Sequence, residues 1–288
     1  MKLNVKKIIF YNLKKVLFIL FILFILFIII YFFNYYKKSM EVSQPINKKI
    51  FITFGATGNG DYNQNSNYKG AVDRITRQSN DLQLFDIVKG YNEDFLKSNS
   101  DFWDRHSNFI SSNIRGYGYW IWKPYIIMKT METMNDGDIL LYADSGCEID
   151  IRKKEFFYEI FKDVEKDLLI ASYAQLEKQY TKMDVLEHFN MNNDDILNSI
   201  QYAATTICIL KCDKTVKFVK EWYEICCNYN LIDDSPSKKE NDISFVENRH
   251  DQSIFSLLSK KPEYNFNNMS IKKAIDIVWN RTGNSILQ

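Results

Sequence analysis

The chain has 288 residues, of which 37 are Lys or Arg and 36 are Asp or Glu, so its net charge at pH 7 is about +1. No basic block stands out beyond the flanks of the first apolar segment, which argues against nucleic acid as a partner. The five cysteines include no CxxC pair and predict neither a zinc site nor a disulfide framework.

The first element is a long uncharged stretch, residues 16–36 (VLFILFILFILFIIIYFFNYY). As a helix it would be about 31 Å long, which matches the hydrocarbon thickness of a bilayer. A signal peptide would have a shorter apolar core followed by small residues, whereas tyrosines and lysines (YYKK) lie at this edge. We therefore expect a retained transmembrane helix at 16–36, preceded by a basic tail (1–15) and followed by a stem (37–48).

The charges around this segment bear on its orientation. Five lysines and no acid precede it, whereas four lysines and Glu41 follow it before the first strand. This bias favours a cytoplasmic N-terminus, as in a type II single-pass protein with a lumenal or extracytoplasmic domain. Glycosylation sequons at Asn268 and Asn280 agree with a lumenal location and predict a glycoprotein.

The remainder, residues 49–288, is the size of one large domain. Short apolar runs alternate with longer amphipathic ones, a pattern that predicts α/β layering. We expect strands over 50–54, 84–88, 138–143, 168–172 and 204–210. We expect helices over 71–80, 123–134, 154–166, 213–227 and 251–258.

The strongest candidate for a site follows the strand at 138–143. There the chain continues as Asp144-Ser-Gly-Cys-Glu148. In open α/β sheets ligands bind beyond the carboxyl ends of strands, so Asp144 would stand where a ligand arrives. Its carboxylate suits Mg²⁺ or Mn²⁺, which could bridge a diphosphate. On turn chemistry alone, an Asp-Ser-Gly turn that merely ends the strand would explain these residues better.

Two other segments favour a ligand site at Asp144 over a simple turn. Residues 115–124 (RGYGYWIWKP) combine glycines, which allow close backbone approach, rings that can stack on a base or sugar, and two cations that can meet phosphate. The alternative is an aromatic corner of the core. Residues 247–253 (ENRHDQS) open a helix with a His, an Asp and an amide. Asp251 could be only a helix cap there.

Together these segments resemble nucleotide-sugar-dependent glycosyltransferases with the GT-A fold. The resemblance rests on WKPYIIMKTMETMNDGDILLYADSG and the later RHDQS, and it covers most of the chain from about Ile50. It implies a mixed α/β sheet flanked by helices and an Asp-x-Asp metal motif after a strand. The second Asp of that motif is Gly146 here, so Glu148 substitutes, the metal is held differently, or metal dependence is lost.

The resemblance assigns roles residue by residue. Catalytic roles fall to Asp144, Asp251 and Gln252. A divalent cation, Mn²⁺ or Mg²⁺, would be held by Asp144, Glu148 and His250. The nucleotide-sugar would lie against Phe54, Gly55, Arg115, Gly116, Tyr119, Trp122 and Lys123. The acceptor would be a glycan, glycoprotein or glycolipid. All of this requires that Asp144 lie close to the helix that begins at His250.

Two alternatives remain open. A short-chain dehydrogenase would use the glycine loop after Phe54 for NAD(P) and the Tyr119-x-x-x-Lys123 spacing for catalysis. However, the polar residues after that loop form helices poorly, and Pro124 predicts a non-helical Lys123. The second alternative is a non-catalytic, anchored carbohydrate-binding domain that has lost its metal site, for which Gly146 is the best support.

Overall fold

The computed structural model describes residues 2–42, 47–56, 67–266, 275–277 and 280–287. The chain divides into two units, Met1–Ile46 and Asn47–Gln288. In the first, α1 (Lys2–Val42) contains one segment, Lys15–Tyr36, that is long and apolar enough to cross a membrane, with a mean hydropathy of 3.4. The predicted apolar N-terminal helix is confirmed. Residues 16–36 are apolar on every side of the helix, a pattern that suits a lipid environment better than one face of a soluble core.

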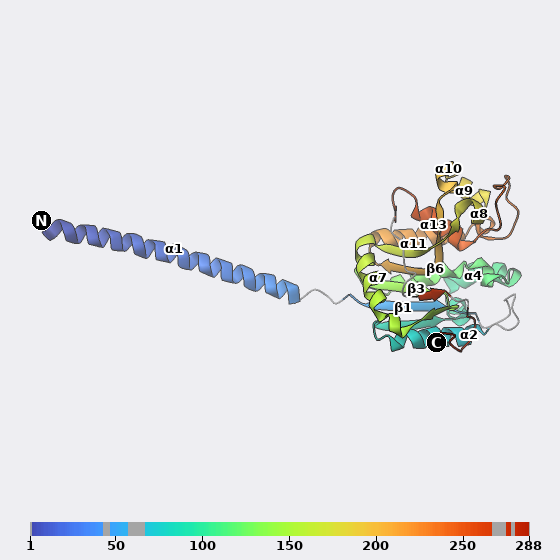
Figure 1. The fold of residues 1–288 in the computed structure, drawn as a ribbon, viewed down its shortest axis with the longest axis horizontal. Helices are drawn as coiled ribbons and strands as arrows, with labels where there is room; N and C mark the ends of the chain where they lie inside the picture. The colour runs from blue at the N-terminus through green and yellow to red at the C-terminus, as the bar shows by residue number, and fades with distance from the viewer. Residues whose placement is uncertain (1, 43–46, 57–66, 267–274, 278–279, 288) are drawn as a thin grey trace. The chain divides into compact units, whose positions relative to one another are not determined.

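The second unit is built on a five-stranded sheet with the strand order β2-β1-β3-β6-β5, within the described residues. In Figure 1, β3 lies between β1 and β6. The strands are β1 (Lys49–Phe54), β2 (Ile87–Tyr91), β3 (Ile139–Ala143), β5 (Leu169–Leu176) and β6 (Ile200–Leu210). β1 pairs in parallel with β2 and β3, whereas β6 is antiparallel to both β3 and β5. The carboxyl ends of β1, β2 and β3 therefore share one edge of the sheet.

Apolar side chains alternate between the two faces of this sheet, as strand geometry requires. On one face, Phe51 and Leu141 pack with α2 (Tyr68–Asp81) and α7 (Lys154–Asp167) in a fully buried cluster. On the other face, Ile52 and Leu140 belong to a larger cluster. That cluster is covered by α4 (Ser100–Ser112), α6 (Trp122–Met131), α11 (Asp213–Cys226) and α13 (Asp251–Ser259). The predicted mixed α/β sheet flanked by helices is confirmed.

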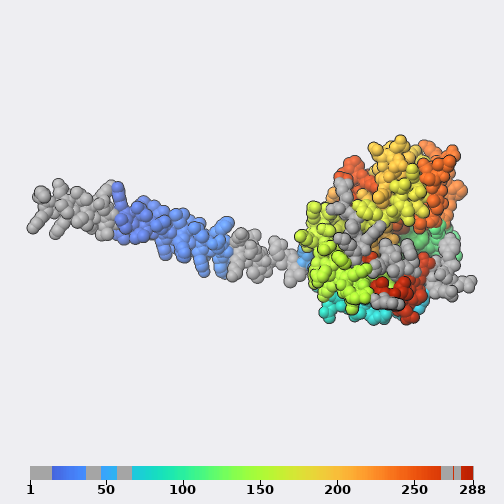
Figure 2. Space-filling view, in the orientation of Figure 1, coloured from blue at the N-terminus to red at the C-terminus, as the bar shows by residue number. Residues whose placement is uncertain are grey.

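A second, two-stranded sheet pairs β4 (Cys147–Ile149) with β7 (Ile275–Ile277) in antiparallel fashion. The buried Arg74 of α2 donates to the carbonyl oxygens of Ser145 and Cys147, and also to that of Thr282. The C-terminal residues (red) accordingly lie beside α2 (cyan) on the face shown in Figure 2. Arg74 thus fixes the turn after β3 and the C-terminal segment together.

Short helical segments connect these elements. They are α3 (Glu93–Ser98), α5 (Gly116–Tyr119), the 3₁₀ turn η1 (Ile151–Lys153), α8 (Glu177–Tyr180), α9 (Met183–His188), α10 (Asp194–Leu197) and α12 (Tyr229–Ile232).

Most of the predicted elements are present, with one clear shift. The strand predicted at 84–88 lies at 87–91 because the apolar Leu84 and Phe85 are used for packing rather than pairing. The Phe85 ring lies 5.5 Å from that of Phe51, and the Asp86 carboxylate accepts a hydrogen bond from the Lys49 backbone at 2.7 Å. An apolar run alone does not show where pairing begins.

Candidate functional site

The site begins where β3 ends. The backbone N–H of Asp144 donates to Thr205 on the neighbouring β6 at 2.9 Å, which continues the strand pairing by one residue. The Asp144 side chain is 20 % exposed, and its Oδ1 accepts a hydrogen bond from the Tyr142 hydroxyl. Asp144 therefore ends a buried strand at the carboxyl edge of the sheet with part of its carboxylate open to solvent.

Helix α6 brings Lys123 to this carboxylate. The Lys123 ammonium lies 3.1 Å from Asp144 Oδ1 and donates to the Ala204 carbonyl oxygen at 3.1 Å. Burial lowers the pKa of Lys123, but Asp144 and Asp251 outweigh that effect and raise the pKa above its ordinary value. Lys123 is inside α6, so the expectation of a non-helical lysine before Pro124 is wrong; the proline falls within the first turn, where it is tolerated.

The start of α13 contributes the third group. Asp251 Oδ2 lies 3.6 Å from the Lys123 ammonium, and only 4 % of the Asp251 side chain is exposed. Burial, with help from the Asp144 charge and against the attraction of Lys123, raises the pKa of Asp251 to about 7. The expected proximity of Asp144 to the helix that follows His250 is confirmed, because one ammonium contacts both carboxylates.

Gln252 faces β6 rather than open solvent. Its Oε1 accepts from the Ala204 backbone N–H at 3.1 Å, and its Nε2 donates to Gln201 Oε1 at 2.7 Å. Gln252 therefore fixes α13 against the strand whose Ala204 carbonyl also receives Lys123. In this arrangement it positions the three charged groups.

His250 lies apart from Asp144. Its ring stacks on Tyr119 and Trp120, with centroids 4.9 and 5.1 Å away. Its Nδ1 is 2.6 Å from the Ile232 carbonyl oxygen and so carries the proton. Its Nε2 has no hydrogen-bond partner among the described residues and lies 3.9 Å from Asp234 Oδ1. Burial lowers the pKa of His250 to about 4, so the ring is neutral at pH 7.

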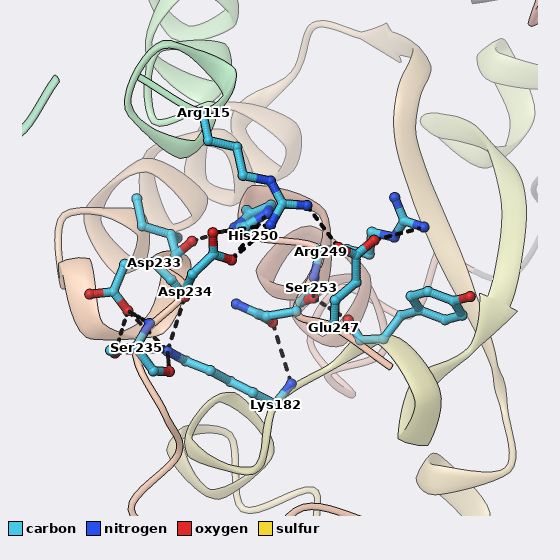
Figure 3. Close-up of polar contacts among 12 residues, drawn as sticks. Arg115, Lys182, Asp233, Asp234, Ser235, Glu247, Arg249, His250 and Ser253 are labelled. Carbon is cyan, nitrogen blue, oxygen red and sulfur yellow. Dashed lines mark hydrogen bonds and ion pairs between the residues drawn. The ribbon is translucent and has the colours of Figure 1, made fainter. Parts of the chain in front are cut away.

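Arg115 is held by two carboxylates (Figure 3). Its guanidinium lies 2.9 Å from Asp234 Oδ1 and 2.7 Å from Glu247 Oε2. In the same view, Lys182 reaches Asp233, with its ammonium 3.1 Å from Oδ1. These ion pairs tie residues 233–247 to the body of the domain. The cation predicted to meet phosphate is thus already engaged.

Between Arg115 and α6 the backbone follows a left-handed turn. All five residues from Gly116 to Trp120 have φ between +51° and +83°. Glycine adopts this geometry freely, but each L-residue costs about 1–2 kcal/mol, and three of the five carry side chains. The turn places the Tyr119 and Trp120 rings on His250. Because Tyr119 is in this turn and Lys123 is in α6, the two do not share a helical face.

The other residues predicted to border the nucleotide form a packed corner. The Phe54 ring stacks on that of Trp122 with centroids 4.0 Å apart, and the Trp122 indole donates to the Gly116 carbonyl oxygen at 2.9 Å. Gly55 packs so closely on α2 that an added Cβ would lie 2.8 Å from Val72. The remainder of the glycine loop, 57–66, lies outside the described residues.

Glu148 points away from Asp144. It is fully buried and accepts hydrogen bonds from Asn280, Ser285, Gln78 and the Ile286 backbone, near the Arg74 guanidinium. Its pKa is lowered, because these hydrogen bonds and Arg74 outweigh burial.

The predicted glycosylation sequon at Asn280 lies in the same region. Asn280 is buried, and its side-chain amide donates a hydrogen bond to Glu148 inside the fold. The sequon at Asn268 lies outside the described residues.

The predicted cation ligands therefore do not converge. Among the residues that the structure describes, no group of three or more His, Cys, Asp or Glu side chains is placed to hold a metal ion. Glu148 and His250 are each engaged elsewhere, and Gly146 offers only its backbone. The donor set present does not fit a dedicated divalent site.

Two residues that contribute to the site were not predicted from the sequence. Tyr142 lies two residues before Asp144 on the same strand, so strand alternation could have placed both on one side. Arg74 had no such signal, because its partners are backbone carbonyls far along the chain.

Comparison with known proteins gives similarity in structure but not in sequence. No protein-family model matches the chain, and no curated protein matches it. Mouse xyloside xylosyltransferase 1 is similar over 78 % of this chain and 84 % of its own, with a TM-score of 0.41 and 9 % identity. The galactosyltransferase LgtC, solved with donor and acceptor sugar analogues, is similar over 78 % of this chain and 85 % of its own, with a TM-score of 0.38 and 13 % identity.

A 4-diphosphocytidyl-2C-methyl-D-erythritol synthase from Anaerococcus prevotii is similar over 75 % of this chain and 99 % of its own, with a TM-score of 0.28 and 10 % identity. TM-scores this low do not allow the function of these proteins to be assigned to this chain.

Proposed function

We propose that the chain is a glycosyltransferase that moves a sugar from a nucleotide-diphosphate donor to a glycan, protein or lipid acceptor. One observation carries the proposal: Asp144, Lys123 and Asp251, from three separate segments, meet at the carboxyl end of β3. Ligands of open α/β sheets bind at this edge. A buried ammonium between two carboxylates is costly to assemble, and such arrangements concentrate at functional sites.

The proposed role of each group follows from how exposed its side chain is. Asp144 is the one with a partly open carboxylate, so it would accept hydrogen bonds from hydroxyls of the donor. Asp251 and Gln252 are packed behind it and would position Lys123 and β6. In the transfer, the bond from the sugar carbon to the diphosphate breaks, an acceptor oxygen bonds to that carbon, and the acceptor proton is released. The proposed transfer involves no metal ion, because the described side chains do not form a site for one.

The proposal extends to the membrane. Lys15–Tyr36 would anchor the chain as a type II single-pass protein, with the domain in a lumenal or extracytoplasmic space. Alkaline carbonate extraction tests the anchor: the intact chain should stay in the membrane pellet. Release of a shortened chain into the supernatant would instead identify residues 16–36 as a cleaved signal.

A screen of nucleotide sugars tests the activity. The full chain in detergent micelles would be incubated with each donor, and release of the free nucleotide diphosphate would be measured. We expect one donor to be hydrolysed, and Asp144→Asn to lower its turnover about 100-fold. Asp163→Asn, at an exposed position on α7, is the matched control and should act like the wild type. If no donor is hydrolysed or bound, the enzymatic proposal fails; carbohydrate binding without turnover would favour the non-catalytic alternative.

A further inference from the structure

We propose that the Lys123 ammonium occupies the place of a divalent cation, so that this site binds a nucleotide diphosphate without a metal ion. The inference deepens the proposed function and rests on it for the identity of the ligand. What it adds is the identity of the group that occupies the cation position at the end of β3.

The geometry places a single cation between two carboxylates. The Lys123 ammonium is 3.1 Å from Asp144 Oδ1 and 3.6 Å from Asp251 Oδ2, and it donates to the Ala204 carbonyl oxygen at 3.1 Å. Two carboxylates and a backbone carbonyl are the oxygen ligands that a hard divalent cation uses. The side chain of Lys123 is 4 % exposed, so the ammonium is a fixed part of the fold.

Among the residues that the structure describes, the neighbouring groups leave no second position for a metal ion. Gly146 presents its carbonyl to the Asn280 backbone N–H at 2.9 Å. The Glu148 carboxylate is saturated by hydrogen bonds on the far side of the turn. The His250 imidazole faces Asp234, which already pairs with Arg115. A divalent ion at Asp144 would lie beside the Lys123 ammonium, and like charges at that distance repel strongly.

The ammonium also explains the departure from an Asp-x-Asp pattern. A divalent ion in a phosphate-binding site is held by one or two carboxylates that are free to accept it. Here the second acid is Asp251, which comes from a different element, and the Lys123 ammonium already lies between the two carboxylates. Gly146 is therefore consistent with a site in which the protein supplies its own cation.

Manganese binding to the full chain in detergent tests this directly. Free Mn²⁺ would be followed by electron paramagnetic resonance at increasing concentrations, with no nucleotide present. We expect the wild type and Lys123→Arg to bind no Mn²⁺ at this site. We expect Lys123→Ala to bind one Mn²⁺ between the two carboxylates, and the double variant Lys123→Ala, Asp144→Asn to lose it.

Stoichiometric Mn²⁺ binding by the wild type that Asp144→Asn abolishes would overturn the proposal. Failure of a folded Lys123→Ala variant to bind Mn²⁺ would overturn it as well, since the carboxylates would then not define a cation position. If that variant does not fold, the proposal is tested by the affinity of the wild type for UDP and GDP, measured in EDTA and in Mn²⁺. Affinity equal within about twofold in EDTA and in Mn²⁺ supports the proposal, and a tenfold or greater gain with Mn²⁺ overturns it.

The same titrations separate this inference from the proposed function. If neither UDP nor GDP binds under any condition, the proposed function fails. The claim about Lys123 is then still judged by the Mn²⁺ spectra alone.

Discussion

Replacement of Asp251 by Asn should change how the stability of the domain depends on pH. In the folded chain, burial raises the pKa of Asp251 to about 7, whereas an unperturbed Asp titrates near 3.8. Between these values the folded state holds a proton that the unfolded state has lost. The wild-type free energy of unfolding therefore falls as the pH rises, until Asp251 is ionised in both states.

The magnitude follows from the shift. Each pH unit between the two pKa values changes the free energy of unfolding by about 1.4 kcal/mol, so the roughly two units between pH 5 and pH 7 amount to about 3 kcal/mol. Asn at this position does not titrate and keeps nearly the same shape. We expect the stability of Asp251→Asn, relative to the wild type, to rise by about 3 kcal/mol between pH 5 and pH 8.

Urea unfolding of the full chain in detergent, at a series of pH values, measures this difference. All five tryptophans lie in residues 49–288, so their fluorescence reports on the α/β domain rather than on the N-terminal helix. Asp163→Asn, on the exposed side of α7, is the control and should follow the wild type. If Asp251→Asn shows the same pH dependence as the wild type, Asp251 is not a buried carboxyl with a raised pKa.

Three further substitutions test other parts of the fold by the same unfolding measurement. Gly118→Ala should cost about 2 kcal/mol or more, because φ is +83° and the new Cβ would lie 2.7 Å from Ile110 Cγ1. Gly283→Ala, whose Cβ would meet nothing closer than 3.5 Å, should change stability by less than about 0.5 kcal/mol, and an equal loss at both glycines would contradict this account. Trp222→Phe should cost about 2 kcal/mol, because the fully buried indole donates to the Asp251 carbonyl oxygen at 2.9 Å; an unchanged midpoint would count against that contact.

The sequence predicts the layered fold well because its pattern of apolar residues is local. Within the run DILLYA (138–143), Ile139–Ala143 forms β3, and all five of these residues are buried. The shift of β2 shows the limit, since Phe85 packs its ring without joining the ladder. The helix α4 gave a weaker signal, because only Phe102, His106 and Ile110 of its thirteen residues are buried.

The sequence predicted the three charged groups of the site, Asp144, Lys123 and Asp251, but not the positions of Arg115 and Glu148. Asp144 and Asp251 could be expected together because each sits at the end or start of an element at one edge of the sheet. Arg115 could not be assigned, because its partners Asp234 and Glu247 lie more than one hundred residues away in the chain. The role of Glu148 likewise depends on long-range contacts with the C-terminal segment, which local spacing does not encode.

The central claim is that a nucleotide diphosphate binds at the carboxyl end of β3 beside Asp144. Calorimetric titration of UDP and GDP into the full chain, with Asp144→Asn titrated in parallel, tests it most directly. We expect one nucleotide to bind the wild type and to bind Asp144→Asn at least tenfold more weakly, a loss of about 1.4 kcal/mol or more. Equal affinity for the two chains, or no binding of either nucleotide, would contradict the claim.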